Sequence, residues 1–232
     1  MSMSNYEIVT DQDGLESVVV YSQTENKPLA RYFENDLTDL YMDGNLSRFN
    51  HYGDKQYKRV ASIAGKYLAR FKRIKGTGLY FYSDTPGSGK TMLSCLLAAA
   101  ITRKHGATSQ VINTISFFQE VQQVFSDESK TIEALMNPLK AVDLLVVDDL
   151  GAEKVSEYRE DLMYEVVNYR LNHGKLMFFT SNYSLDKLPY HSRIVSRITE
   201  MSFLIAMPEE DMRVQSQRKN SDELFKALLT NN

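Results

Sequence analysis

The sequence predicts an α/β fold in which helices cover both faces of a mainly parallel sheet. Short apolar runs alternate with longer segments whose apolar residues recur every three or four positions, as strands that alternate with helices do. A glycine-rich turn at residues 84–91 joins one of these runs to a helical segment. Because 232 residues exceed a typical domain of roughly 150, we expect an extension at residues 1–50 and one full domain at residues 51–232.

The first predicted helix begins near Tyr57. Its apolar residues follow at three- and four-residue spacing and form a stripe on one face, while the other face carries basic residues. The apolar residues are Val60, Ile63, Ala64, Tyr67, Leu68 and Phe71. The run at residues 79–82 then predicts a strand, and residues 90–103 predict a helix that stops at Gly106.

The rest of the chain continues the alternation. Four further strands are expected, which together with residues 79–82 give a five-stranded parallel sheet, and four further helices are expected. The strands lie at residues 110–112, 144–147, 176–179 and 203–206, and the helices at residues 117–125, 157–171, 191–200 and 222–229.

The single cysteine restricts the chemistry of the chain. Cys95 excludes an intramolecular disulfide and any zinc site built from several cysteines, and its apolar surroundings place it in the core. The N-terminus has no basic region followed by an apolar stretch, and no window approaches the ~18 apolar residues of a membrane span. We therefore expect a cytoplasmic protein with no membrane contact and no zinc.

The net charge of −3 is distributed unevenly. Residues 1–50 hold nine acidic and three basic residues, whereas residues 55–75 hold eight basic residues and no acidic one. An acidic arm beside a basic segment is typical of a partner-binding extension next to a polyanion contact.

The turn has the sequence of a phosphate-binding loop, and it has the strand-to-helix context which that motif requires. It consists of Asp84, Thr85, Pro86, Gly87, Ser88, Gly89, Lys90 and Thr91. The glycines let successive N–H groups point at a phosphate, Lys90 reaches the β- and γ-phosphates of ATP, and Thr91 holds Mg²⁺. Asp84 replaces the usual first glycine. Its charge weakens nucleotide binding unless its side chain points away.

Polar residues follow two of the predicted strands. Asp148 is expected to bind Mg²⁺ through water, and Asp149 to orient or deprotonate the attacking water. Since many such ATPases use glutamate where Asp149 stands, slow turnover is expected. Asn182 is a candidate to bind the γ-phosphate or that water. The alternative is structural: the two acids cap a buried strand end, and the asparagine is a turn residue.

Two runs carry a resemblance to a known family. They are GLYFYSDTPGSGKTMLSCLLAAAI and LLVVDDLGAEKVSEYREDLMYEVVNYRLNHGKLMFFTSN. Over about residues 57–213 the chain resembles the AAA+ domain of the bacterial replicative-helicase loaders of the DnaC/DnaI family, relatives of the DnaA initiator and the IstB transposition ATPase. The resemblance implies an AAA+ P-loop NTPase with ATP and Mg²⁺ as cofactors.

The resemblance also implies catalytic arginines. Arg197 matches the arginine finger, which acts on the γ-phosphate of a neighbouring copy, and Arg193 matches its companion. Arg213 falls where the family has its second sensor arginine. A finger of this kind implies an ATP-dependent homo-oligomer. Each arginine is otherwise a solvated surface charge.

Loaders of this family bind single-stranded DNA through the AAA+ domain and a helicase through an N-terminal extension. Candidate DNA contacts are the basic segment 55–75 and the pair Phe117-Phe118, although the first also fits a solvated helix face and the second also fits the core. Candidate helicase contacts in the arm are Tyr21, Tyr32, Phe33 and Tyr41. The arm is short, and we expect it to be weakly structured alone.

The resemblance therefore implies an ATPase that loads a hexameric replicative DNA helicase onto single-stranded DNA, with ATP binding and hydrolysis as the switch. Two alternatives stay open. One is an IstB-like helper of DNA transposition, which needs no helicase. The other is a non-catalytic module that binds a host replication protein, which the aspartates Asp84 and Asp149 at unusual positions suggest.

Overall fold

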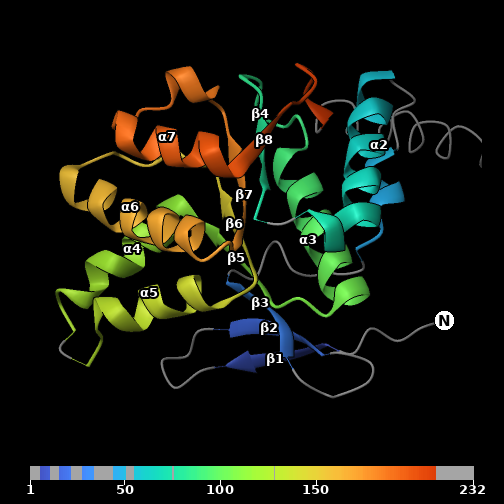
Figure 1. Cartoon of the computed structure of the whole chain (residues 1–232). Helices are drawn as coiled ribbons and strands as arrows, with labels where there is room; N and C mark the ends of the chain where they lie inside the picture. The colour runs from blue at the N-terminus through green and yellow to red at the C-terminus, as the bar shows by residue number, and fades with distance from the viewer. Residues whose placement is uncertain are drawn as a thin grey trace, which may run out of the picture.

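The computed structural model describes residues 6–10, 16–21, 28–33, 44–50, 55–74, 76–127 and 129–212. Within these ranges the chain forms an α/β structure with one sheet of eight strands in the order β1-β2-β3-β5-β6-β7-β4-β8 (Figure 1). Helices cover this sheet on two sides.

Five parallel strands form the part of the sheet that was predicted. They are β5 (Ser109–Asn113), β6 (Leu144–Asp148), β7 (Leu176–Ser181), β4 (Gly78–Tyr82) and β8 (Ser202–Ala206). Each pairs in parallel with its neighbours in that order. Because parallel strands end at the same edge, the loops after β4, β6 and β7 meet there, which is where ligands bind to open α/β sheets.

Both faces of this parallel region are buried, as its near-continuous apolar strands predict. On one side lie α2 (Lys55–Arg70) and α3 (Lys90–His105). On the other lie α4 (Thr114–Val124), α5 (Ile132–Ala141), α6 (Glu157–Asn172) and α7 (Ser192–Met201). Alternate residues of β4 serve the two cores, since Leu79 and Phe81 pack with α2 and α3 while Tyr80 packs in the opposite cluster.

The N-terminal arm adds strands that the sequence did not predict. Strands β1 (Tyr6–Thr10), β2 (Glu16–Tyr21) and β3 (Pro28–Phe33) are antiparallel to one another. Strand β3 then pairs in parallel with β5, with Ala30 opposite Ser109. The sequence predicts an arm that is weakly structured alone, and that stays a prediction. In this structure the arm is paired with β5, which offers it a row of backbone hydrogen-bonding groups.

Helix α5 was also missed, and its proline explains why. Pro138 lies inside the helix, and the segment before it is polar, so the local pattern does not predict a helix. The helix nevertheless buries Met136 and Leu139 against the core that contains α6. Tertiary packing therefore overrides a weak local signal.

Several local expectations are confirmed. Gly106 ends α3 with φ 70°, the left-handed conformation that favours glycine at a helix C-terminus. Cys95 is buried in α3, and its burial raises the pKa of the thiol. The helix expected at residues 222–229 lies outside the described residues. No helix in the described ranges is both long and apolar enough to cross a membrane.

A buried arginine fixes the start of two central strands. The Arg170 guanidinium in α6 donates to four backbone carbonyls, which lie in α5, in the loop before β6 and in β7. These acceptors are Leu139, Val142, Asp143 and Leu176, at 2.6, 2.9, 3.1 and 2.6 Å. Burial lowers the pKa of Arg170 to about 9, against the raising effect of Asp143. The four carbonyl dipoles offset only part of the desolvation, since the buried Nε has no hydrogen-bond partner among the described residues. This network holds β6 and β7 in register below the site.

Candidate nucleotide-binding site

The loop between β4 and α3 has the backbone of a phosphate-binding loop. Gly87 and Gly89 adopt left-handed conformations, with φ 76° and 86°. A Cβ atom at Gly89 would lie 2.6 Å from the Met212 sulfur and 2.8 Å from a ring carbon of Phe49. Glycine is therefore required by both the backbone and its neighbours, and the helix that follows points its N-terminus at the loop.

The side chain of Lys90 lies inside this loop. It is 5% exposed, and its ammonium donates to the Ser83 carbonyl at 3.2 Å, the Thr85 carbonyl at 3.1 Å and the Ser88 hydroxyl at 3.2 Å. The loop thus holds one positive charge at its centre. A polyphosphate that enters the loop meets this charge together with the backbone N–H groups.

Thr91 and Asp148 meet as the sequence predicts. The Thr91 hydroxyl donates to Oδ1 of Asp148 at 2.7 Å, although 57 positions separate them. Asp148 ends β6 and is 3% exposed. Its burial and the neighbouring charge of Asp149 raise the pKa of Asp148 to about 6, against the lowering effect of hydrogen bonds from Thr180, Thr91 and Asn113.

This pair has the chemistry of a magnesium site. A hydroxyl and a carboxylate supply the hard oxygen donors that Mg²⁺ prefers, and a divalent cation would relieve the cost of the buried Asp148 charge. The residues therefore fit the ion, with Thr91 and Asp148 as the groups that would hold it beside the phosphates.

Asp149 is held in an uncommon backbone conformation. Its φ is 55°, and it is the only residue other than glycine with a positive φ in the described ranges. Its N–H donates to the Thr180 hydroxyl at 2.9 Å, and its carboxylate accepts from the Asn113 amide at 3.4 Å. Strain of this kind persists where neighbours fix it, as is common at functional sites. The first contact fixes the backbone, and the second holds the carboxylate beside Asn113 at the end of β5.

Asn113 and Thr180 were missed by the sequence reasoning. Asn113 ends β5 directly opposite Asp148 in the register, and its side chain also caps α4. Thr180 donates to Asp148 at 2.6 Å and accepts from the Asp149 N–H. The sequence does carry a signal for these two residues. Each is a polar residue at the end of a strand, and the ends of neighbouring parallel strands meet at the same edge of the sheet.

Asn182, the predicted sensor, lies one residue beyond β7 and is half-buried. The structure records no hydrogen bond of its side chain to another described residue, and its contact with a phosphate or a water stays a prediction. Thr180 is the residue of this strand end that the structure brings to the two aspartates.

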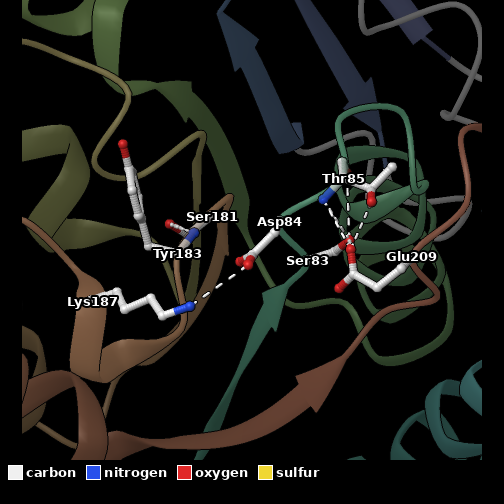
Figure 2. Close-up of polar contacts among 7 residues, drawn as sticks. All are labelled: Ser83, Asp84, Thr85, Ser181, Tyr183, Lys187 and Glu209. Atoms are coloured by element: carbon white, nitrogen blue, oxygen red, sulfur yellow. Dashed lines mark hydrogen bonds and ion pairs between the residues drawn. The ribbon is translucent and has the colours of Figure 1, made fainter.

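Asp84 points away from the loop that follows it. Figure 2 shows its carboxylate directed toward Lys187 in η3 (Leu185–Lys187), with 3.7 Å between Oδ2 and Nζ. Both side chains are largely exposed. An aspartate is tolerated at the first loop position when its side chain points away from the phosphates. Asp84 meets this condition, since its carboxylate faces Lys187.

The opposite side of the loop entrance is held by Glu209. One carboxylate oxygen accepts from the Ser83 hydroxyl at 3.0 Å, the Thr85 N–H at 3.0 Å and the Thr85 hydroxyl at 2.7 Å (Figure 2). Partial burial acts to raise the pKa of Glu209, but the hydrogen bonds from Thr85 and Ser83 outweigh it and hold this pKa below its ordinary value. The segment after β8 is thereby tied to the loop.

A second link follows three residues later. The N–H of Met212 donates to the Gly87 carbonyl at 3.0 Å. A Cβ atom at Gly87 would lie 2.1 Å from the carboxylate of Asp211, so this segment lies directly against the glycines. Residues 209–212 therefore form one side of the phosphate-binding loop.

Comparison with known proteins now decides the family. A sequence profile described as IstB-like ATP binding protein matches residues 48–220, which include the whole site. The chain belongs to the IstB-like ATP-binding protein family. The loop around Lys90 lies within the matched residues.

Among curated proteins, this member of the IstB-like family is similar to replicative helicase loaders. It is 31% identical over 170 residues to the loader DnaI of Bacillus subtilis (strain 168), a match that covers 69% of this chain and 49% of DnaI. It is 22% identical over 192 residues to the loader DnaC of Buchnera aphidicola subsp. Baizongia pistaciae (strain Bp), covering 81% of this chain and 76% of that one. The chain thus spans about half the length of DnaI.

Solved structures agree with the predicted fold. A DnaI crystal structure matches with a TM-score of 0.58 and 27% identity, over 67% of this chain and 86% of that one. A crystal structure of the DnaC helicase loader matches with a TM-score of 0.63 and 25% identity, over 73% and 99% of the two chains. The AAA+ fold predicted from the sequence is confirmed.

The candidate arginines of this IstB-like chain lie on α7, on the sheet face opposite α3 (Figure 1). Arg193 pairs with Asp161 of α6 at 2.5 Å and lies over the Tyr164 ring. Arg197 is 38% exposed and lies 3.5 Å from Glu200 of its own helix. Both side chains are partly exposed, but Arg193 is tied to a neighbouring helix, whereas the ion pair of Arg197 lies within its own helix. Arg213 lies outside the described residues.

The loop after Asp149 connects the site to the start of α7. Glu153 is 7% exposed, and its carboxylate accepts from the Gly151 N–H at 3.0 Å and from the Tyr190 hydroxyl. Tyr190 precedes α7 by two residues. The start of the helix that carries Arg197 is therefore tied to the same loop that carries Asp149.

Phe117 and Phe118, expected either as base contacts or as core, are core residues. They are 6% and 1% exposed and pack in the cluster that contains α6. Neither ring offers a free face for stacking on a base.

Proposed function

We propose that this protein is an ATPase that loads a hexameric replicative DNA helicase onto single-stranded DNA, with ATP binding and hydrolysis as its switch. The single observation that carries the proposal is the contact of Thr91 with Asp148, which joins the nucleotide loop to a buried carboxylate in a chain similar to helicase loaders. ATP and Mg²⁺ are the proposed cofactors.

The residues of the chain divide the work of binding and hydrolysis. Lys90 and the loop N–H groups bind the phosphates of ATP. Mg²⁺ held at Thr91 and Asp148 would neutralise phosphate charge. Asp149 accepts the proton of the attacking water or orients that water, and Asn113 holds the carboxylate in place. Aspartate is shorter than glutamate, so slow hydrolysis is expected.

Arg197 is the proposed arginine finger, with Arg213 as the second sensor. Arg197 is partly exposed on α7 and its ion pair lies within its own helix, which suits a role on the γ-phosphate bound by a neighbouring copy. Arg197→Ala should leave ATP affinity unchanged and abolish hydrolysis stimulated by DNA or by self-association. Lys154→Ala serves as the control for loss of a basic residue outside the site. If wild type and Arg197→Ala show equal stimulated hydrolysis, Arg197 is not the arginine finger.

The helicase is the proposed partner of the arm at residues 1–50, and single-stranded DNA is the proposed partner of the AAA+ domain at residues 51–232. The similarity to DnaI and DnaC supports the helicase. A DnaA initiator of the same fold has been solved with AMPPCP and single-stranded DNA. Nucleotide-dependent binding to DNA by this chain is proposed on that likeness of fold.

Co-purification with a replicative helicase tests the proposal. Tagged wild type should retain the helicase in the presence of ATP. Retention by Lys90→Ala should be the same with and without ATP. Lys154→Ala removes an exposed lysine outside the site and is the matched control. Failure to retain helicase with and without ATP contradicts the loader function.

The family profile favours a second candidate, an IstB-like helper of DNA transposition. Such a protein shares the nucleotide site but has a transposase as its partner. ATP binding without helicase retention, together with retention of a transposase, supports this candidate. Failure to bind ATP at all supports the third possibility, a non-catalytic module that binds a replication protein.

A further inference from the structure

The outward surface of α2 and η2 (Phe71–Arg73) is strongly basic. We call it the α2 basic face. Each of its seven basic side chains is exposed, and the sequence from residue 55 to residue 83 contains no acidic residue. The seven are Lys55, Lys58, Arg59, Lys66, Arg70, Lys72 and Arg73.

The helical spacing places these charges on one side. At 3.6 residues per turn, the five bases of α2 fall within an arc of about 120°. The buried residues Tyr57, Val60, Ala64 and Tyr67 occupy the opposite side. The charge therefore forms a continuous strip along the helix.

Charge pairing within the described ranges does not account for this strip. The structure records ion pairs for Lys140, Lys187, Arg193 and Arg197 with nearby carboxylates, and it records none for the α2 basic face within the residues that it describes. The face thus presents its charge to solvent.

Helix stability accounts for only part of the strip, since Arg70 stands in the last turn of α2, where the helix dipole favours basic residues. Lys55 and Lys58 stand at the N-terminal end of α2, where the helix dipole favours acidic residues, and the first turn holds none. Lys66 and Arg70 are four positions apart, and like charges at that spacing repel each other across one turn. The bases at the N-terminal end and the like-charge pair disfavour their own helix, as is expected where the charge has a partner.

The strip is rigidly mounted on the domain. The Tyr67 hydroxyl donates to the Thr77 carbonyl at 2.7 Å, and the Tyr57 hydroxyl donates to the Glu210 carbonyl at 3.0 Å. The ring of His105 at the end of α3 stacks on Phe71 with 5.0 Å between centroids. This contact brings the exposed Arg103 and Lys104 of α3 beside the C-terminal end of the strip.

We infer that the α2 basic face binds the phosphate backbone of single-stranded DNA. The inference rests on the proposed function, which supplies the nucleic acid, and it adds the surface that touches it. A straight row of lysine and arginine side chains without aromatic rings contacts phosphates rather than bases. Binding at this face is therefore independent of base sequence and sensitive to salt.

The salt dependence of binding tests the inference. Binding of a fluorescein-labelled dT oligonucleotide is measured by anisotropy across a range of salt concentrations. For single strands, the slope of log K against log salt falls by about 0.7 for each phosphate contact. Lys66→Gln combined with Arg70→Gln should lower the slope by about 1.4. Glutamine preserves helix propensity, and thermal unfolding checks the fold.

The control removes two lysines elsewhere, with Lys130→Gln and Lys154→Gln in one variant. Its slope should equal that of wild type. An unchanged slope in the α2 variant overturns the inference while the proposed function stands. A wild type that does not bind the oligonucleotide at all contradicts the DNA-binding part of the proposed function, and the inference falls with it.

Discussion

Thr180 donates its hydroxyl hydrogen to Asp148 at 2.6 Å, from the strand next to the one that Asp148 ends. The same oxygen accepts the N–H of Asp149 at 2.9 Å. One hydroxyl thus orients the carboxylate proposed to hold Mg²⁺ and the backbone of the residue proposed to activate water. The position of the reacting groups depends on this contact as much as on the two aspartates.

Replacing Thr180 by valine should separate the orientation of the two aspartates from the binding of ATP. Valine has the same shape and lacks both hydrogen bonds, so we expect the rate of ATP hydrolysis to fall about 10- to 100-fold while ATP affinity changes little. The apparent affinity for Mg²⁺ should weaken. Thr180→Ser restores the hydroxyl and should restore most of the rate. Loss of rate in both variants to the same degree would contradict the role of the hydroxyl.

Asp148 should make the protein less stable at neutral pH in the absence of metal. Its pKa is raised to about 6 in the folded chain, above the value of 3.8 for a free aspartate, so the folded state binds more protons between these values. Stability is therefore lost as the pH rises from about 4 to 6. Asp148→Asn should stabilise the protein at pH 7 by up to about 3 kcal/mol.

Urea unfolding in EDTA measures this effect. The difference between wild type and Asp148→Asn should disappear below about pH 4, where both side chains are neutral. Thr91→Val is the control, because it removes a hydrogen-bond donor to Asp148 without removing the charge. A wild type more stable than Asp148→Asn at pH 7 would show that the buried charge is already compensated.

Glu209 should affect the affinity for ATP in two ways, and two substitutions separate them. Glu209→Ala removes the three hydrogen bonds that fix Ser83 and Thr85, and ATP affinity should fall about three- to tenfold. Glu209→Gln retains an acceptor and removes a negative charge near the polyphosphate, so its affinity should equal or exceed that of wild type. Titration with a fluorescent ATP analogue measures both, and Glu210→Gln is the control. If Glu209→Ala and wild type bind ATP with identical affinity, Glu209 does not support binding by fixing Ser83 and Thr85.

Arg170 should be the most sensitive basic residue for stability. Arg170→Lys cannot reach the four carbonyls that the guanidinium bonds, so buried acceptors lose their donors. We expect a loss of about 3 kcal/mol or more in the free energy of unfolding, measured in urea. Arg159→Lys, which removes one exposed contact with the Lys154 carbonyl, should cost less than about 1 kcal/mol. Equal losses of unfolding free energy in the two variants would show that the register of β6 and β7 does not depend on Arg170.

Local patterns predicted the central sheet and the nucleotide loop. Apolar strands, the glycines at 87 and 89 and the paired aspartates each leave a signal within a few residues of sequence. Strands β1 to β3 leave a weaker one, since the pairing of β3 with β5 is set by an edge that lies about eighty residues further along the chain. Helix α5 was hidden by Pro138.

The supporting residues of the site could not be predicted in the same way. Asn113, Thr180 and Glu209 are common residue types at strand ends and in loops, and their roles come from partners that are 31 to 124 positions away. Tertiary pairing assembles them. Their roles become visible only when the strand order is known.

Loading of a helicase onto single-stranded DNA is the step that the proposed function assigns to this protein, and it can be measured. A replicative helicase is mixed with a circular single-stranded DNA that carries an annealed, labelled strand, and release of that strand is measured with the loader and ATP. Wild type should stimulate release, Lys90→Ala should not, and Lys154→Ala should behave as wild type. Equal release with wild type, with Lys90→Ala and without any loader would contradict the account.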